Sequence, residues 1–169
     1  MLSLNIREMN IEEIDIVRKI RLNSYSDYEV FVSKEHWSVL KNTLLSENDI
    51  NSNSKIYVAE DENEIVGTVV LFPGEVKAYD WSDSVQSYPE IRMLAVEPSA
   101  RKKGIARALM EHSLKVAKEE GNTEIGLHTA TFMTKAASLY ENMGFVRVPE
   151  KDLEPMNDGV IVKAYKYEL

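Results

Sequence analysis

The chain has 169 residues, of which 44% are hydrophobic and 28% charged, and its net charge is −8. Length and composition are ordinary for a globular protein and predict one domain over residues 1–169. The acidic balance argues against nucleic-acid binding, which needs Lys and Arg against phosphates. The absence of cysteine excludes disulfides and a cysteine nucleophile. No apolar run is long enough for a membrane span and no signal peptide is evident, so we expect a cytoplasmic protein without a membrane partner.

Near the N-terminus, apolar and polar side chains alternate from Leu2 to Arg7, which predicts a half-buried strand. Asn10 is placed to cap a helix from Ile11 to about Asn23. Ser33 is placed to cap a second helix, from Lys34 to about Leu45, because apolar side chains recur there at helical spacing. The N-terminal quarter is therefore predicted to be one strand followed by two helices.

The middle of the chain begins with a predicted β-hairpin. Residues 56–59 and 65–72 are rich in β-branched side chains and flank the polar run 61–64. A long connection, residues 75–89, follows, and connections of this length are often functional. From Lys77 onward it carries interleaved acidic and aromatic side chains, namely Tyr79, Asp80, Trp81, Asp83 and Tyr88. We expect it either to cover a binding site or to be a surface loop without a role.

Residues 90–121 combine a predicted strand, a short loop and a long amphipathic helix. The strand, Glu90 to Val96, is apolar and is ended by Pro98. The helix begins near Ile105, and Gly121 is suited to follow its C-terminus. The junction from Arg101 to Arg107 carries four cationic residues and also Gly104, which lets a ligand approach the backbone. Free amides at a helix start bind anions, so this loop is predicted to hold a phosphate or pyrophosphate.

The last third of the chain adds a strand over residues 124–129, a helix over residues 135–143 and a strand over residues 160–167. Thr134 is expected to cap the helix, and Gly144 to end it. The predicted order of strands and helices describes a mixed α/β domain with one sheet and helices on both of its faces.

Two blocks of the sequence resemble the GNAT superfamily of N-acetyltransferases. Arg101-x-x-Gly104-x-Ala106, after a strand that ends Leu94-Ala95-Val96, is similar to the acyl-CoA signature of that family. The block from Ala136 to Phe145 is similar to its A-x-x-L-Y-x-x-x-G-F segment. The resemblance covers roughly residues 56–145. It implies a GNAT-like mixed sheet with central splayed parallel strands and a CoA thioester, acetyl-CoA, as cosubstrate.

The resemblance also implies where the cofactor binds. Pantetheine enters the gap between the splayed strands, and pyrophosphate rests on the backbone amides of the following loop. The residues that this assigns to the cofactor are Leu94, Ala95, Val96, Arg101, Lys102, Lys103, Gly104, Ile105, Ala106 and Arg107. One departure concerns an asparagine that family members often have seven residues before the tyrosine, where this chain has Met133. Tyr25, Tyr28 and Trp37 are candidates for lining the acceptor pocket, although packing between the helices explains them as well.

Acetyl transfer to an amine needs a neutral nucleophile and a proton for the departing thiolate. Tyr140 is the proposed general acid, because it matches the tyrosine of the second block and a phenol can donate a proton. Two residues are candidate bases. Glu90 resembles the catalytic glutamate of histone-type members, and His128 lies on the strand where other members carry their base. For both bases a purely structural role stays open.

The sequence therefore predicts an enzyme that moves an acetyl group from acetyl-CoA to a primary amine, either a small molecule or a peptide, by direct attack. Carboxylates at Asp80, Asp83 and Glu90 favour a cationic acceptor. A non-catalytic acyl-CoA sensor is the alternative, since it needs the Arg101 to Arg107 loop but neither base nor acid. We expect no metal site, because His36, His112 and His128 show no ligand spacing, and we allow for a homodimer.

Overall fold

The computed structural model describes residues 4–46, 53–74 and 87–169. Seven strands form one sheet in the order β1-β2-β3-β4-β5-β7-β6. Neighbouring strands are antiparallel except for β4 and β5, which are parallel. The strands are β1 (Leu4–Glu8), β2 (Lys55–Asp61), β3 (Glu64–Phe72), β4 (Glu90–Val96), β5 (Glu124–Ala130), β6 (Val146–Arg147) and β7 (Val162–Glu168).

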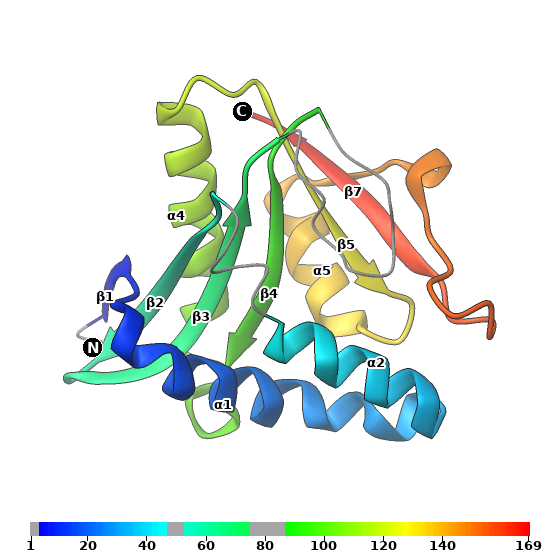
Figure 1. Cartoon of the computed structure of the whole chain (residues 1–169). Helices are drawn as coiled ribbons and strands as arrows, with labels where there is room; N and C mark the ends of the chain where they lie inside the picture. Colours follow the sequence, from blue (N-terminus) through cyan, green and yellow to red (C-terminus); the bar gives the residue numbers. More distant parts are fainter. Residues whose placement is uncertain (1–3, 47–52, 75–86) are drawn as a thin grey trace.

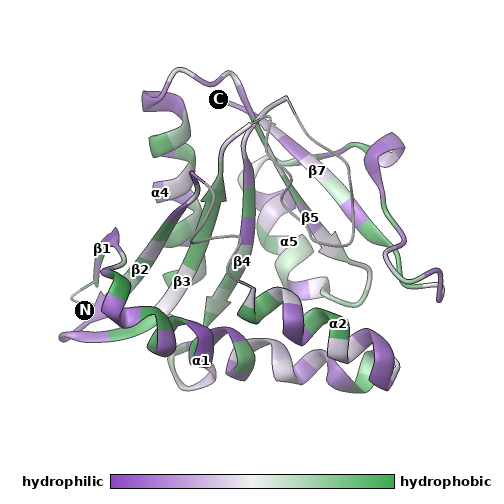
Figure 2. Cartoon of the chain, in the orientation of Figure 1, coloured by the Kyte–Doolittle hydropathy of each residue, from purple (hydrophilic) through white to green (hydrophobic). Residues whose placement is uncertain are grey.

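Helices cover both faces of this sheet. The helices α1 (Ile14–Tyr25) and α2 (Lys34–Leu45) cross one face, and α4 (Ile105–Glu119) and α5 (Thr134–Met143) lie behind the other (Figure 1). Bands of hydrophobic and hydrophilic residues alternate along α1 and α2, as amphipathic helices require (Figure 2). Val17, Leu44 and Val58 belong to the core under these two helices, and Leu109 and Ile125 to the core under α4 and α5. The predicted fold class is confirmed.

Gly67 of β3 fixes how closely α4 approaches the sheet. A Cβ atom at this position would lie 3.0 Å from Ile105 Cγ2 and 3.1 Å from Leu109 Cδ1. Both side chains are buried on the first turns of α4, and neither has room to withdraw through a close-packed core. Glycine at position 67 therefore seats the start of α4 directly on β3.

A bulge in β4 separates it from β5. Val70 pairs with Arg92 and Thr68 pairs with Ala95, so Met93 and Leu94 together oppose Val69. Met93 has φ 53°, a left-handed conformation that non-glycine residues seldom adopt. Beyond this point β4 leaves β5, and the parallel pairing is confined to Glu90 with Gly126 and Ile91 with Leu127. The predicted splay of the central parallel strands is confirmed, and its local cause is this bulge.

Apart from small shifts in the bounds of strands, several predicted elements differ from the structure. Residues 11–13 form a short 3-10 helix before α1, which begins at Ile14. Thr134 is the first residue of α5 and not its cap, because the chain turns one residue earlier, where Ala137 N donates to Met133 O at 3.1 Å. The two-residue strand β6 was not predicted, since so short a segment shows no alternation.

Candidate active site

The loop from Arg101 to Gly104 and the start of α4 present backbone amides to a cleft. Lys102 and Gly104 have left-handed backbones, with φ 67° and 78°, and such turns aim successive amides toward one point. Ala108 N, which donates to Gly104 O at 3.1 Å, is the first amide bonded in the helical pattern. The preceding amides of α4 have no intrahelical partner. A Cβ atom on Gly104 would meet nothing within 4 Å, so the backbone there is open to a ligand.

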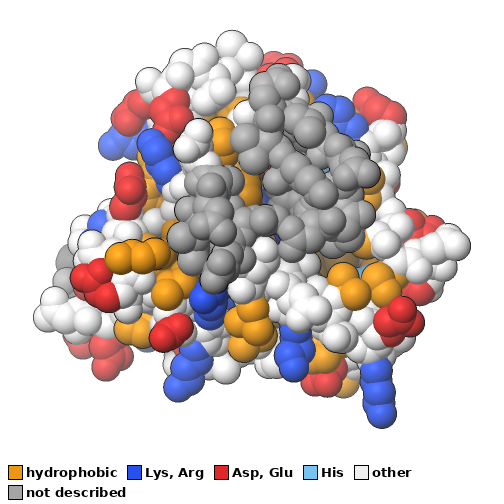
Figure 3. Space-filling view, in the orientation of Figure 1, with side chains coloured by type: hydrophobic (Ala, Val, Ile, Leu, Met, Phe, Trp, Pro, Cys, Tyr) orange, Lys and Arg blue, Asp and Glu red, His pale blue; other side chains and the backbone are white. Residues whose placement is uncertain are grey.

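The cleft has a volume of about 650 Å³ and is walled by β4, α4, α5 and the 3-10 helix η2 (Ser26–Phe31). Of the predicted cofactor residues, all but Ala95 and Lys103 line it. Ala95 is buried in the sheet, whereas Lys103 is exposed beside the cleft. Figure 3 shows one face of the molecule, and acidic and basic side chains are interspersed around the edge of that face.

The cationic side chains of the loop have unequal freedom. Arg101 Nη1 lies 2.6 Å from Asp27 Oδ2, and its Nη2 donates to Ser24 O at 3.1 Å. Arg101 thus ties the loop to the end of α1 while it also lines the cleft. Arg107 is paired with Glu111 at 2.9 Å. Lys102 and Lys135 line the cleft without an ion pair among the described residues, so they are the cations best placed to meet an anion.

The cleft continues into a smaller cavity of about 70 Å³ between the splayed strands. Tyr28 and Leu94 line both spaces. Tyr140 of α5 lines the smaller one, and within the described residues its hydroxyl makes no hydrogen bond to protein. Burial raises the pKa of the Tyr140 phenol. The neighbouring Tyr25 and Tyr28 raise this pKa further, whereas Arg92 lowers it. Tyr140 is therefore a protonated phenol at neutral pH, with a hydrogen to donate.

Glu90 and His128 form a buried pair. Their side chains are 4% and 3% exposed, and Glu90 Oε1 lies 2.8 Å from His128 Nδ1. The other ring nitrogen, Nε2, is 3.2 Å from the backbone oxygen of Lys151, which can only accept. A hydrogen therefore lies in the contact between Nδ1 and the carboxylate, and Nε2 donates to Lys151 O when it carries one. The two candidate bases are thus one proton-sharing unit.

His128 is the member of this pair that reaches the cavity between the strands. The Lys151 segment behind it is fixed by Tyr88, since Lys151 Nζ lies 3.1 Å from Tyr88 Oη and 4.4 Å from the centre of its ring. Tyr88 was expected in a loop and is buried. Tyr79, Asp80, Trp81 and Asp83, which the sequence analysis also singled out, lie outside the described residues.

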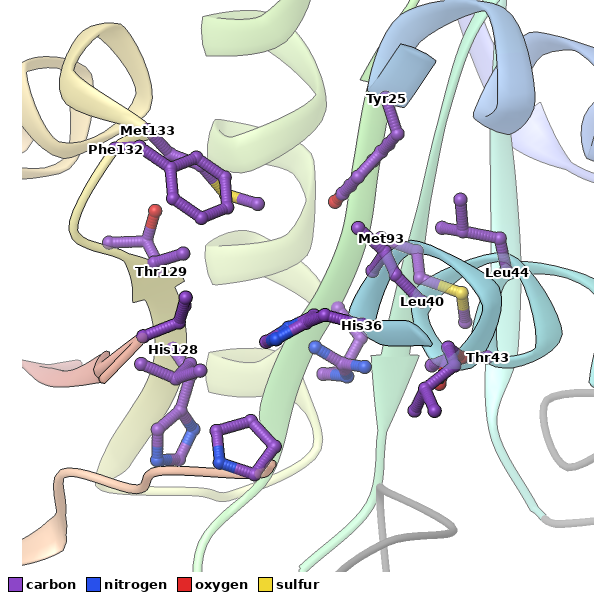
Figure 4. A pocket seen from close by; sticks show the side chains of 16 residues that line it. Tyr25, His36, Leu40, Thr43, Leu44, Met93, His128, Thr129, Phe132 and Met133 are labelled. Atoms are coloured by element: carbon purple, nitrogen blue, oxygen red, sulfur yellow. The ribbon is translucent and has the colours of Figure 1, made fainter. Parts of the chain in front are cut away.

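A third cavity, of about 80 Å³, adjoins the second on the side of α2 (Figure 4). Tyr25, Met93 and His128 line both of these cavities. Of the three aromatic candidates for the acceptor pocket, Tyr25 and Tyr28 line cavities, whereas Trp37 lines none of the three cavities. Sequence reasoning missed Phe132, which lines both the cleft and the third cavity and stacks on Phe31 at 5.6 Å.

Two negative findings complete the description. Among the described residues no group of three or more His, Asp or Glu side chains could hold a metal ion. Within the same part of the chain, no helix is long and apolar enough to cross a membrane.

Comparison with known proteins identifies the family. Residues 15–145 match the model of the Acetyltransferase (GNAT) family. The chain is 33% identical over 104 residues to N-acetyltransferase 8F1 of Rattus norvegicus, covering 62% of this chain and 45% of that protein. It is 31% identical over 124 residues to N-acetyltransferase 8 of Homo sapiens, covering 68% and 52%. The chain thus spans about half the length of these relatives. The chain belongs to the GNAT family of acetyltransferases, and the predicted resemblance is confirmed.

Solved structures share the whole fold. A GNAT-family acetyltransferase from Staphylococcus aureus Mu50 has a TM-score of 0.71 at 20% identity, with 99% of each chain covered. The PaiA N-acetyltransferase of Thermoplasma acidophilum, solved in complex with coenzyme A, has a TM-score of 0.67 at 18% identity, with 98% of this chain and 99% of that chain covered. At these identities the likeness concerns the fold alone.

Proposed function

We propose that the protein is an acetyl-CoA-dependent N-acetyltransferase that acetylates a primary amine by direct attack. Family membership supports the class of reaction. The observation that carries the proposal is the continuous path from the cleft, through the gap between β4 and β5, to Tyr140 and His128. A protein that only senses acyl-CoA would need the cleft. It would need neither the phenol of Tyr140 nor the pair formed by Glu90 and His128 at the inner end of the cleft.

The residues around the cleft fit acetyl-CoA, which supplies an acetyl thioester when it is bound. The amides of residues 102–107, with Lys102 and Lys135, would hold its phosphates at the start of α4. The edge of β4 from Leu94 to Val96 no longer pairs with β5, so its backbone groups can bond an extended amide chain as a further strand would.

In the reaction, the amine nitrogen bonds to the acetyl carbon while the carbon–sulfur bond breaks. Tyr140 Oη donates its proton to the departing thiolate, because this phenol is protonated and free of other partners. The pair formed by Glu90 and His128 takes the proton that the amine nitrogen loses, and it returns this proton to solvent after the acetylated amine has left. Glu90 also holds the imidazole ring in place, as carboxylates do for catalytic histidines.

Release of free thiol from acetyl-CoA in the presence of amines tests this proposal. The chain contains no cysteine, so every thiol that a chromogenic reagent detects comes from the cosubstrate. We expect saturable, amine-dependent release, with the acetylated amine identified by mass spectrometry. Acetyl-CoA that binds without thiol release, across small amines, polyamines, amino acids and peptide N-termini, would instead indicate a sensor.

A further inference from the structure

The third cavity is walled mainly by apolar side chains. Val39, Leu40 and Leu44 come from α2, Met93 from the bulge in β4, and Val160 and Val162 from the start of β7 and the residues before it. In Figure 4 the α2 side chains face Phe132 and Met133 across this space, with His128 at one end. The cavity adjoins the gap that holds Tyr140, so a group seated in it lies next to the reacting atoms of the proposed reaction.

The polar side chains on the α2 side of this cavity are bonded to the protein itself. His36 Nδ1 lies 2.6 Å from Asp158 Oδ2, and Thr43 Oγ1 donates to Val39 O at 3.1 Å. Among the described residues, no carboxylate lines the cavity. Asp158 is not among the lining residues; it bonds to His36 and accepts from Val160 N at 3.1 Å. Among the described residues, this wall therefore offers no carboxylate to pair with a buried cation.

The opposite end of the cavity is polar, since Tyr25, Arg92 and His128 line both it and the space between the strands. A reactive amine fits this polar end, and its substituent fits the apolar end. The positive charge of Arg92 at this end disfavours a protonated amine and so favours the neutral form, which is the form that attacks. A second ammonium on the substituent would be buried without a partner, at a cost that far exceeds the gain from contact.

We propose, on the basis of the function proposed above, that the acceptor is a primary amine whose substituent is small and apolar, rather than a polyamine. A space of about 80 Å³ admits a substituent of a few carbon atoms, since one water molecule occupies ~30 Å³ of liquid. The apolar wall thus sets the choice of acceptor.

Two isosteric amines test the proposal in the wild-type protein. Butylamine and 1,3-diaminopropane have the same number of non-hydrogen atoms in the chain. Butylamine ends in a methyl group, whereas 1,3-diaminopropane ends in a second ammonium group. We expect kcat/KM, measured by thiol release, to be about a hundredfold higher for butylamine, because only its end group can enter the apolar wall. From ethylamine to butylamine, kcat/KM should rise about fourfold for each methylene.

Two matched variants test whether the apolar wall of the third cavity causes the preference for butylamine. Val39→Asp adds a carboxylate to the cavity and should lower kcat/KM for butylamine about tenfold while raising it for 1,3-diaminopropane. Val30→Asp makes the same change at a residue that is 85% exposed and should alter neither rate constant. Thermal melts of both variants check folding, and the wild-type comparison stands even if Val39→Asp does not fold.

The outcomes separate the two proposals. Equal or faster turnover of 1,3-diaminopropane by the wild type overturns the inference about the acceptor and leaves the acetyltransferase intact. Thiol release with neither of these amines but with amino acids or peptide N-termini also overturns the inference alone. Failure of all amines, with acetyl-CoA binding intact, overturns the acetyltransferase proposal and the inference that rests on it.

Discussion

Glu90 Oε1 and His128 Nδ1 lie 2.8 Å apart in a buried contact that joins the start of β4 to the parallel strand β5. The register Glu90 opposite Gly126 sets the two side chains close together, although 38 residues separate them in the chain. Because the pair shares one proton, its ionisation belongs to both residues and not to either alone. The two candidate bases therefore act as one proton-sharing pair.

We therefore predict that Glu90→Gln and His128→Gln have the same effect on the pH profile. Each variant should lose the ascending limb of kcat/KM against pH and should lower kcat/KM by about 10²-fold at neutral pH. His112→Gln is the control, because His112 packs on Tyr57, with 4.5 Å between the ring centres, and lines none of the three cavities. If one of the two variants keeps the wild-type limb, the residues do not act as a unit.

The second prediction concerns Gly104, whose left-handed backbone borders the open cleft. Asp and Asn have nearly the same shape and both tolerate this conformation better than other side chains, so Gly104→Asn is the control for Gly104→Asp. Acetyl-CoA affinity, measured by calorimetry, should fall at least about tenfold further in the Asp variant, because a carboxylate opposes phosphates at a helix start. If the Asp and Asn variants bind acetyl-CoA with equal affinity, the phosphates do not bind at the amides next to Gly104.

The third prediction concerns stability and its pH dependence. Hydrogen bonds from Arg7, at 2.7 Å and 2.9 Å, lower the pKa of Glu13 from 4.5 to about 2. A lowered carboxyl pKa stabilises the fold above pH 4.5, and this stabilisation is lost as the pH falls toward 2. Glu13→Gln should thus cost about 1 kcal/mol of unfolding free energy at pH 7. Urea denaturation should show this difference narrowing between pH 4.5 and pH 2, whereas a constant difference would contradict the assignment.

Much of the fold could be predicted because local patterns encode it. The bounds of β4 follow from an apolar run ended by proline, and Ser33 caps α2 as expected, since His36 N donates to its hydroxyl at 3.0 Å. The loop before α4 was predicted as an anion site from Gly104 and its cations, and in the structure it borders a cleft. These features depend on residues that are neighbours in the chain.

The remaining features depend on contacts between distant segments. No glycine marks the bulge at Met93, so the strand pattern gives no sign of it. The contact between Arg101 and Asp27 spans 74 residues, and an isolated loop cannot reveal it. The pairing of Glu90 with His128 requires the register of two parallel strands, which side-chain alternation does not determine. Sequence reasoning therefore named Glu90 and His128 as two separate candidate bases and left the contact between them open.

The most direct measurement of the central claim compares acetyl-CoA binding and turnover in Tyr140→Phe. The change removes only the hydroxyl, so the dissociation constant for acetyl-CoA should stay within about twofold of the wild type while kcat falls by ~10²-fold. Tyr165→Phe is the control, because Tyr165 is equally buried but donates to Glu141 at 2.8 Å and lines none of the three cavities. Binding and kcat that both survive in Tyr140→Phe would show that this phenol does not supply the proton and would contradict the mechanism.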